Sequence, residues 1–537
     1  RGLGDVYKRQ VPEKVKVVAA YAFGYNKNIT GVKFANKDTY VGDDTFVGCT
    51  GLVSAELPAE LRTLSSEMFL GCTALKQMDL PDSITSIGES AFNGCTALET
   101  LKLPAKLETL GKSILSRSAV KKIEIPATMV SITTAAFSGA ASLEEVVLPD
   151  SIAAIGQEAF GRCTNLSKIN IPEGVTVIDS SAFYNCSSLA EITLPSTLKQ
   201  LGNNAFANSG IVSVKVPEGI TAVNCAFSNA QNLKSITLPS TLENISNNEF
   251  SGCKSLESIK IPAGVKEIGT GAFQNCAALT AVEVPEGITE FKDNTFSGCA
   301  ALEKINFPGS LTKIGTGVFQ NCAALKEITL PDALTEIGVR AFSGAAIEKI
   351  NGGKNVSKTG TNAFANTPWA ENDRGAILGS VLYSGRNISG NYMVPAGIAT
   401  IHSSSFKDNA SLTSITISKN VKNVGSYAFR NCTSLKTVII YSDDATFGST
   451  IFRDITDLPS VKCYKDSTAD AYLTTNYPDI DKTYFDSKAD DVKAMFSAIP
   501  AVDMVTAADR EVIDAALDAY DALSDEDKES ISYVQYN

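Results

Sequence analysis

Apolar residues recur along this chain at a nearly constant interval of 23 residues, and a phenylalanine marks each repeat. The clearest run is Phe250, Phe273, Phe296, Phe319 and Phe342. A period of this length, with Leu and Ile at set offsets, predicts a solenoid in which each turn packs on its neighbours. The rest of the series, with Ile114 expected to hold the position between Phe92 and Phe137, is Phe23, Phe46, Phe69, Phe92, Phe137, Phe160, Phe183, Phe206, Phe227, Phe364, Phe406, Phe429 and Phe452.

One clean copy, residues 322–338, shows the pattern within a turn. Its Ile-Thr-Leu alternation predicts a short strand, which Pro331 ends because proline has no N–H to donate to a ladder. A second short extended segment follows, and Gly338 is expected to allow the corner before Phe342. The positions expected to face inward are Leu325, Ile328, Leu330, Leu334 and Ile337.

Charged residues support an in-line stack of turns. Equivalent positions in neighbouring turns would lie about 4.8 Å apart, so like charges should be avoided. Lys121 and Lys122 are followed one turn later by Glu144 and Glu145. Because each such pair contributes only ~0.2–1 kcal/mol, we expect the alternation mainly to specify register.

Ten of the twelve cysteines stand three residues after a marker phenylalanine and so form one column of the solenoid. Neighbouring thiols in that column would be too far apart, and too nearly parallel, for a disulfide. We interpret them as small buried side chains. Since no C-x-x-C pair occurs, a zinc site is not expected either. The ten are Cys49, Cys72, Cys95, Cys163, Cys186, Cys253, Cys276, Cys299, Cys322 and Cys432.

The consensus C-x-x-L-x-x-I-x-L-P-x-x-L-x-x-I-G-x-x-A-F-x-x-C resembles the BspA-like, or Treponema pallidum type, leucine-rich repeat. The resemblance covers roughly residues 11–484. It implies a curved right-handed solenoid with a concave parallel sheet, found mostly in secreted or surface-attached bacterial proteins. Members with assigned roles are mainly adhesins, and the resemblance carries no catalytic residues over.

The expected organisation has six parts. Residues 1–10 fit no repeat and resemble translated adapter sequence, so a signal peptide is expected to be missing from the chain rather than truly absent. Leucine-rich-repeat turns occupy 11–364, a hairpin-like interruption 365–405, and the final repeats 406–465. A cap helix and linker follow at 466–486, with Asp466 or Ser467 as the helix cap. Residues 487–537 resemble a truncated three-helix module of Gram-positive surface proteins.

The interruption contains the one tryptophan of the chain, Trp369. A structural hairpin that patches two turns is the favoured interpretation. If an aromatic recognition spot exists, its best candidates are Trp369, Tyr383 and Tyr392, because loops that interrupt a rigid scaffold often carry function.

The outward row of the first strand is polar and mixed in sign, and aromatic residues are almost missing from it. It is interpreted either as a solvated face or as a broad binding groove. Its candidate ligand-binding residues are Lys102, Lys215, Lys260 and Glu283. The full row is Glu56, Asp79, Lys102, Glu124, Asn170, Thr193, Lys215, Thr237, Lys260, Glu283, Asn306 and Thr329.

In the last part, the apolar positions fall on helical spacing, with Ile513, Leu517 and Tyr520 expected on one face. From residue 487 onward there are 4 basic and 12 acidic residues, which carry most of the net charge of −12. The remaining solenoid is nearly neutral, so no nucleic-acid partner is expected.

Signals for chemistry are weak. The single histidine, His402, has no accompanying nucleophile or carboxylate motif, and no phosphate-binding or dinucleotide fingerprint occurs. Catalytic residues, cofactors and metals are therefore not expected. No run of 18 apolar residues exists, so no membrane insertion is expected. The favoured prediction is a non-enzymatic, monomeric, extracellular or cell-surface protein that mediates adhesion through protein or glycan partners. The alternative is a rigid stalk that presents another domain, such as an enzyme.

Overall fold

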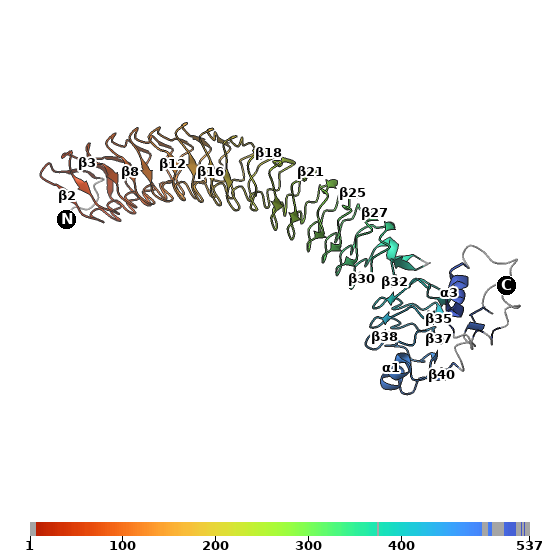
Figure 1. The fold of residues 1–537 in the computed structure, drawn as a ribbon. Helices are drawn as coiled ribbons and strands as arrows, with labels where there is room; N and C mark the ends of the chain where they lie inside the picture. The colour runs from red at the N-terminus through yellow and green to blue at the C-terminus, as the bar shows by residue number, and fades with distance from the viewer. Residues whose placement is uncertain are drawn as a thin grey trace. The chain divides into compact units, whose positions relative to one another are not determined.

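The computed structural model describes residues 7–372, 375–485, 492–493, 495–496, 510–521, 523, 528 and 531. These residues fall into two compact units, which are described separately: residues 1–308 with 322–324, and residues 309–321 with 325–537. In each unit, successive turns of the chain stack face to face, as the ribbon in Figure 1 shows. The predicted repeat solenoid of the leucine-rich-repeat type is therefore present in both.

Each turn contributes up to two short strands, which build two parallel ladders. The first ladder of the first unit contains β1 (Tyr7–Val11), β3 (Ile29–Phe34), β5 (Ser54–Glu56), β7 (Gln77–Met78), β9 (Thr100–Leu101), β11 (Lys122–Glu124), β13 (Glu145–Val147), β15 (Lys168–Ile169), β18 (Ser213–Lys215), β19 (Ser235–Thr237), β21 (Ser258–Lys260), β23 (Ala281–Glu283) and β25 (Lys304–Ile305). Its second ladder contains β2 (Val17–Val18), β4 (Tyr40–Val41), β6 (Thr63–Leu64), β8 (Ser86–Ile87), β10 (Thr109–Leu110), β12 (Ser131–Ile132), β14 (Ala154–Ile155), β16 (Val177–Ile178), β17 (Gln200–Leu201), β20 (Asn244–Ile245), β22 (Glu267–Ile268) and β24 (Glu290–Phe291).

The second unit continues the same scheme. Its first ladder contains β27 (Glu327–Leu330), β29 (Lys349–Gly352), β33 (Gly390–Met393), β35 (Leu412–Ile417), β37 (Thr437–Ile440), β39 (Ser460–Cys463) and β40 (Lys482–Tyr484). Its second ladder contains β26 (Lys313–Ile314), β28 (Glu336–Ile337), β30 (Lys358–Thr359), β32 (Val381–Ser384), β34 (Thr400–Ile401), β36 (Asn423–Val424) and β38 (Thr446–Phe447). The remaining described elements are η1 (Pro368–Glu371), β31 (Ala376–Leu378), α1 (Thr468–Asn476) and α3 (Arg510–Asp521).

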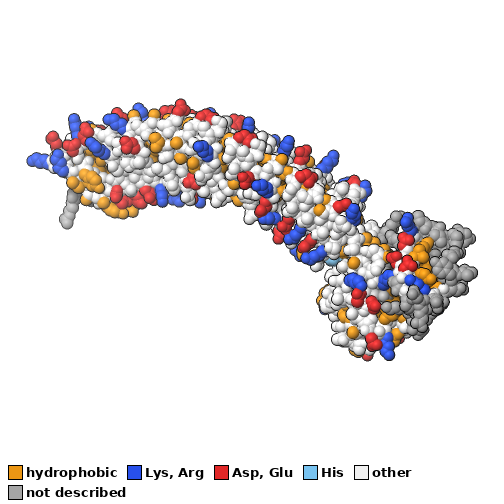
Figure 2. Space-filling view, in the orientation of Figure 1, with side chains coloured by type: hydrophobic (Ala, Val, Ile, Leu, Met, Phe, Trp, Pro, Cys, Tyr) orange, Lys and Arg blue, Asp and Glu red, His pale blue; other side chains and the backbone are white. Residues whose placement is uncertain are grey.

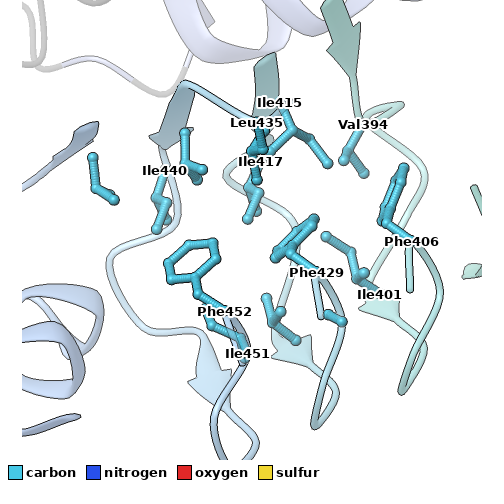
Figure 3. Close-up of a cluster of buried hydrophobic side chains, with 14 of the residues drawn as sticks. Val394, Ile401, Phe406, Ile415, Ile417, Phe429, Leu435, Ile440, Ile451 and Phe452 are labelled. Carbon is cyan, nitrogen blue, oxygen red and sulfur yellow. The ribbon is translucent and has the colours of Figure 1, made fainter. Parts of the chain in front are cut away.

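Side chains alternate across the strands as the sequence predicted. In β21 the central Ile259 is buried while Ser258 and Lys260 are exposed. Every member of the predicted outward row is exposed. In the second unit, buried residues between Leu382 and Ile480 form one apolar cluster. Figure 3 shows part of this cluster, where Phe406, Phe429 and Phe452 lie between the two ladders.

The marker position lies in a loop that has the same backbone in every described repeat. The residues two before and two after the marker have positive φ, for example Asn248 at 56° and Gly252 at 75° around Phe250. Ser113 and Arg117, both at 54°, flank Leu115 in this way. The prediction that Ile114 holds the marker position is therefore wrong: Leu115 holds it, and Ile114 takes the preceding position, which is usually alanine.

Gly338 also acts differently from the prediction. Its φ is not positive; instead, a Cβ there would lie 2.5 Å from the carbonyl carbon of Gly315 in the preceding turn. The glycine is needed because stacked backbones approach closely at this corner, not because the corner requires a left-handed conformation.

The predicted charge register is confirmed. Lys121 pairs with Glu144, and Lys122 with Glu145, each with N–O distances of 3.1 Å. Lys122 and Glu145 are also direct partners in the ladder between β11 and β13. The same alternation places Lys349 at 2.8 Å from Glu327 in the second unit.

The interpretation of the cysteine column is confirmed and extended. All twelve cysteines are free, and the ten in the column are buried. Each of the ten thiols also donates to the backbone carbonyl of the marker phenylalanine one turn earlier, as from Cys276 to Phe250 at 3.1 Å. The column therefore links turns by hydrogen bonds as well as by packing.

Two expectations about the ends of the solenoid need correction. Residues 7–10 were expected to fit no repeat, but they form β1, which pairs in parallel with β3 from Lys8↔Gly31 onward. The segment after the cap helix was expected to be a connector, but β40 adds a further parallel rung beside β39. The cap itself is as predicted, since the Ser467 hydroxyl accepts from the Asp470 N–H at the start of α1.

Most of the predicted three-helix module lies outside the described residues. The described part includes α3, whose buried side chains are Ala515 and Ala516. Leu517 was expected on the packed face but is 47% exposed, so that assignment is wrong. Of the helices in the described residues, none is long and apolar enough to cross a membrane.

Candidate functional site

The interruption at 365–405 is a turn whose marker loop is shortened. Leu382 in β32 pairs with Ile401 in β34, and Tyr392 in β33 pairs with Ile415 in β35. Ten positions therefore span what fourteen span in the next turn, and no phenylalanine is present among them. The row of stacked marker loops therefore lacks one loop between the turns of Phe364 and Phe406.

Buried polar contacts fix the shortened loop. Asn409 stands where most turns have cysteine, is 1% exposed, and donates to the carbonyls of Gly385 at 2.9 Å and Ile388 at 2.7 Å. A Cβ on Gly385 would lie 2.2 Å from the Phe406 ring, so this ring closes directly onto the loop backbone. The shortened turn is thus held as tightly as a regular one.

Two of the three candidate aromatics complete the phenylalanine column. Trp369 and Tyr383 contact Phe364 with ring centroids at 4.7 and 5.3 Å. Tyr383 is 7% exposed, and its hydroxyl accepts from the Phe364 N–H at 2.9 Å. Burial raises the pKa of Tyr383 to about 12, although the Phe364 N–H and the charge of Arg386 act in the opposite direction. Trp369 is half-buried.

Tyr392 lies elsewhere, on the first ladder. It is half-buried, and its ring is 6.0 Å from that of Phe406. The structure therefore brings Trp369 and Tyr383 together but does not add Tyr392 to them.

Because the loop is short, a hollow of about 310 Å³ opens beside it. We call this hollow the notch. Its lining comes from loop residues of the Phe342 and Phe364 turns, from η1, from the shortened loop and from the Phe406 turn. The lining residues are Arg340, Ser343, Asn362, Ala365, Asn366, Ala370, Glu371, Tyr383, Ser384, Arg386, His402, Ser403 and Ser404.

The charged residues of the notch are exposed. Arg340 and Arg386 are both exposed, and neither forms an ion pair within the described part of the chain. Glu371 is exposed as well. Charges of both signs are interspersed over the face drawn in Figure 2. The described lining of the notch contains two arginines and one glutamate.

His402 has a structural environment. It is 9% exposed, its Nδ1 lies 3.0 Å from the Ser403 carbonyl oxygen, and its Nε2 lies 3.1 Å from that of Thr359. Burial lowers its pKa, although these carbonyl groups act to raise it. The ring also packs at 4.9 Å from Tyr383. It therefore links the turns on either side of the notch.

The four candidates on the first ladder belong to other turns. Lys215, Lys260 and Glu283 are exposed in β18, β21 and β23, and Lys260 is the direct ladder partner of Glu283. Lys102 lines a separate hollow of about 560 Å³, where β9 and β11 belong to different sheets. These four residues are in the first unit, whereas the notch is in the second.

Sequence reasoning missed Arg340, Arg386 and Asn409. Asn409 could have been recognised, because it is a polar residue in the cysteine column three positions after Phe406. Arg340 and Arg386 could not, since nothing in one turn's sequence shows that its neighbour lacks a loop. Within the described ranges, no three His, Cys, Asp or Glu side chains are grouped so that they could hold a metal ion.

Fold and site together define a leucine-rich-repeat solenoid with one specialised turn. The family model for the BspA type leucine-rich repeat region matches residues 16–144, 115–225, 243–370 and 377–495, which is most of the chain. The chain therefore belongs to the BspA-type leucine-rich repeat family. A comparison with curated proteins found no match.

Solved structures of similar proteins come from several bacteria. A leucine-rich repeat protein from Bacteroides ovatus is 23% identical, with a TM-score of 0.49, over 83% of this chain and 93% of that one. A leucine rich cell surface protein from Faecalibacterium prausnitzii is 24% identical, with a TM-score of 0.33, over 66% and 83%. The T. pallidum leucine-rich repeat protein is 31% identical, with a TM-score of 0.21, over 38% and 77%.

Proposed function

We propose that this chain is a non-enzymatic, extracellular protein that mediates adhesion at a cell surface by binding protein or glycan partners. The observation that carries the proposal is the exposed row of the first ladder. Lys215, Thr237, Lys260 and Glu283 present polar side chains from four successive turns at one rigid spacing. An extended, preorganised surface of this kind binds with little loss of conformational entropy.

Membership of the BspA-type family supports the same proposal, because its repeats build scaffolds for interaction. Trp369, Tyr383 and Tyr392 remain candidate ligand-binding residues in this proposal, together with Lys102, Lys215, Lys260 and Glu283. No cofactor or metal is needed, and a monomer is sufficient. Nucleic acid and membrane lipid are not proposed as partners.

The test is a binding survey of the full chain against immobilised matrix proteins, mucins and cell-wall glycans. Saturable binding is expected, and Lys215→Glu with Lys260→Glu should weaken it by about tenfold or more if charge complementarity contributes. Lys266→Glu is the matched control, since Lys266 is also exposed but lies beside the second ladder at β22. An equal effect of the control would contradict binding by the row.

A stalk is the second candidate function. It is favoured by ion pairs within the ladders, such as Lys33–Glu56 at 2.7 Å and Lys349–Glu327 at 2.8 Å, because charges that satisfy each other leave little for a ligand. A stalk would show no saturable ligand on any surface in the survey. It would present a further domain, in which case a catalytic function would belong to that domain.

A further inference from the structure

We propose that the notch binds an acidic sugar, that is, a carboxylate-bearing monosaccharide unit of a glycan. The inference rests on the proposed adhesive function and names one ligand class for it. Its starting point is the pair Arg340 and Arg386, which come from two different turns and line the same hollow. Neither has an acidic partner among the residues that the structure describes.

The guanidinium group is suited to a carboxylate. It is planar, stays charged, and offers two parallel N–H groups that match the two carboxylate oxygens. Two such groups around one hollow favour an anion over a neutral ligand. Among the described lining residues Glu371 is the one carboxylate, so together with Arg340 and Arg386 they carry a net positive charge in a chain whose net charge is −12.

The remaining lining is suited to a sugar. Ser343, Ser384, Ser403 and Ser404 provide hydroxyl groups that both donate and accept, and Asn362 and Asn366 provide amides with the same capacity. Glu371 can accept from a sugar hydroxyl. A ring with several hydroxyl groups and one carboxylate satisfies this set, whereas an acidic peptide side chain presents only the carboxylate.

Size and rigidity agree with this ligand. About 310 Å³ is near the lower end of the range for small-molecule sites and accommodates one monosaccharide unit. The floor is fixed by contacts already described, from Asn409 to the shortened loop and from the Phe364 N–H to Tyr383. A preformed polar hollow needs little reorganisation on binding, which favours specific recognition of one unit of a glycan.

In the test, the full chain is titrated separately with N-acetylneuraminic acid, glucuronic acid and the uncharged control glucose. Ligand-observed NMR measures binding in each titration. One or both acids should bind with a Kd of about 1 mM, and glucose should bind at least tenfold more weakly. Arg340→Asn and Arg386→Gln should each weaken the acid by about tenfold, since each removes a charge-assisted pair. Comparison of the two acids shows whether the notch prefers a sialic acid or a uronic acid.

Arg117→Asn is the matched control. Arg117, like Arg340, is an exposed arginine at φ 54° in a marker loop, but it lies outside the notch. Asparagine suits positive φ, so both variants should keep the circular dichroism spectrum and melting temperature of the parent. If Arg340→Asn does not fold, Arg386→Gln alone decides, because that residue is exposed and its φ is not positive.

Equal binding of acid and glucose would overturn the proposal, as would binding that is unchanged in both notch variants. So would a short glutamate peptide that binds through both arginines while neither sugar binds. If the surface survey shows saturable ligands but the sugars do not bind, the notch inference fails and the adhesive function stands. If free acid binds through the arginines but no surface is recognised, the adhesive function fails and the notch inference stands.

Discussion

The turns around Phe273 in the first unit and the turn after Phe364 in the second fill the position of the marker ring in different ways. Phe273 stacks on Phe250 and on Phe296 with centroids 5.4 Å apart and planes within 15° of parallel. After Phe364 the next ring is missing, and Trp369 and Tyr383 fill its place at interplanar angles of 57° and 82°. The regular rings stack nearly in parallel, whereas the substitutes are tilted, and the notch lies beside the shortened loop of that turn. In the second unit, the notch lies where the repeat is interrupted.

The largest expected effect is on the regular column. Phe273 is 0% exposed, so Phe273→Ala should lower the free energy of unfolding by about 3–5 kcal/mol. Trp369→Ala should cost less, about 1–3 kcal/mol, because the indole is half-buried. Urea unfolding gives both values, and hydrogen exchange shows whether the loss is local to the neighbouring turns.

The same variants separate structure from recognition. If Trp369→Ala loses stability but leaves ligand binding unchanged, the indole is only part of the column. If it costs as much as Phe273→Ala, the two regions are packed equally well, and the comparison drawn above is wrong.

A second irregular turn contains a buried carboxyl group. The step from Phe206 to Phe227 is only 21 residues, and the Cys225 N–H donates to Glu249 Oε2 at 2.5 Å across the next interval. Glu249 is 0% exposed in a position that is usually alanine. Burial raises its pKa from 4.5 to about 7, against the opposing effect of nearby backbone N–H groups.

This pKa shift predicts a stability loss between pH 4.5 and 7. Below pH 4.5 the carboxyl group is protonated in both the folded and the unfolded state. Above pH 4.5 the unfolded chain releases the proton more readily, so the free energy of unfolding falls by about 3 kcal/mol by pH 7. It stays at this lower value at higher pH. Glu249→Gln should remove this part of the pH dependence of unfolding. The exposed Glu243→Gln is the control, and an identical pH profile for Glu249→Gln and the parent would contradict the assignment.

Two substitutions in the cysteine column should change the free energy of unfolding by smaller amounts and in opposite directions. Ser209 occupies this column, is 4% exposed, and its hydroxyl has no hydrogen-bond partner among the described residues. Ser209→Ala should therefore stabilise the fold by about 1 kcal/mol. Cys276→Ala should destabilise it by a similar amount, since it loses the bond to the Phe250 carbonyl. Thermal unfolding measures both, and two changes of the same sign would refute the distinction.

The smallest expected effect is on a surface charge pair. Lys349→Glu places two acidic side chains opposite each other in β27 and β29 and should lower the melting temperature slightly at low salt. Adding Glu327→Lys to the same chain should recover the lost stability, because the pair is then oppositely charged again. The loss in the single variant should be smaller in 0.5 M salt, which screens the repulsion. A loss that persists at high salt would mean that the pair does more than fix register.

Most of the fold could be predicted because the same pattern of apolar and polar positions recurs in turn after turn. The marker phenylalanine recurs in nearly every turn, and a cysteine follows it by three residues in ten of them, so the column, the two ladders and the free thiols follow from the pattern alone. The alternation of Lys121 and Glu144 fixed the register for the same reason. The error at Ile114 arose because Ile and Leu are equally apolar, and only the backbone conformation around Leu115 distinguishes them.

The sequence by itself determined the period, the buried and exposed positions, and the state of the cysteines, because these depend on contacts that every turn makes with an identical neighbour. The tertiary structure alone decided the strand at Tyr7, the buried carboxyl of Glu249, and the notch with Arg340 and Arg386. Each of these depends on how one turn differs from the turn beside it. Such a difference becomes visible only when the two turns are stacked.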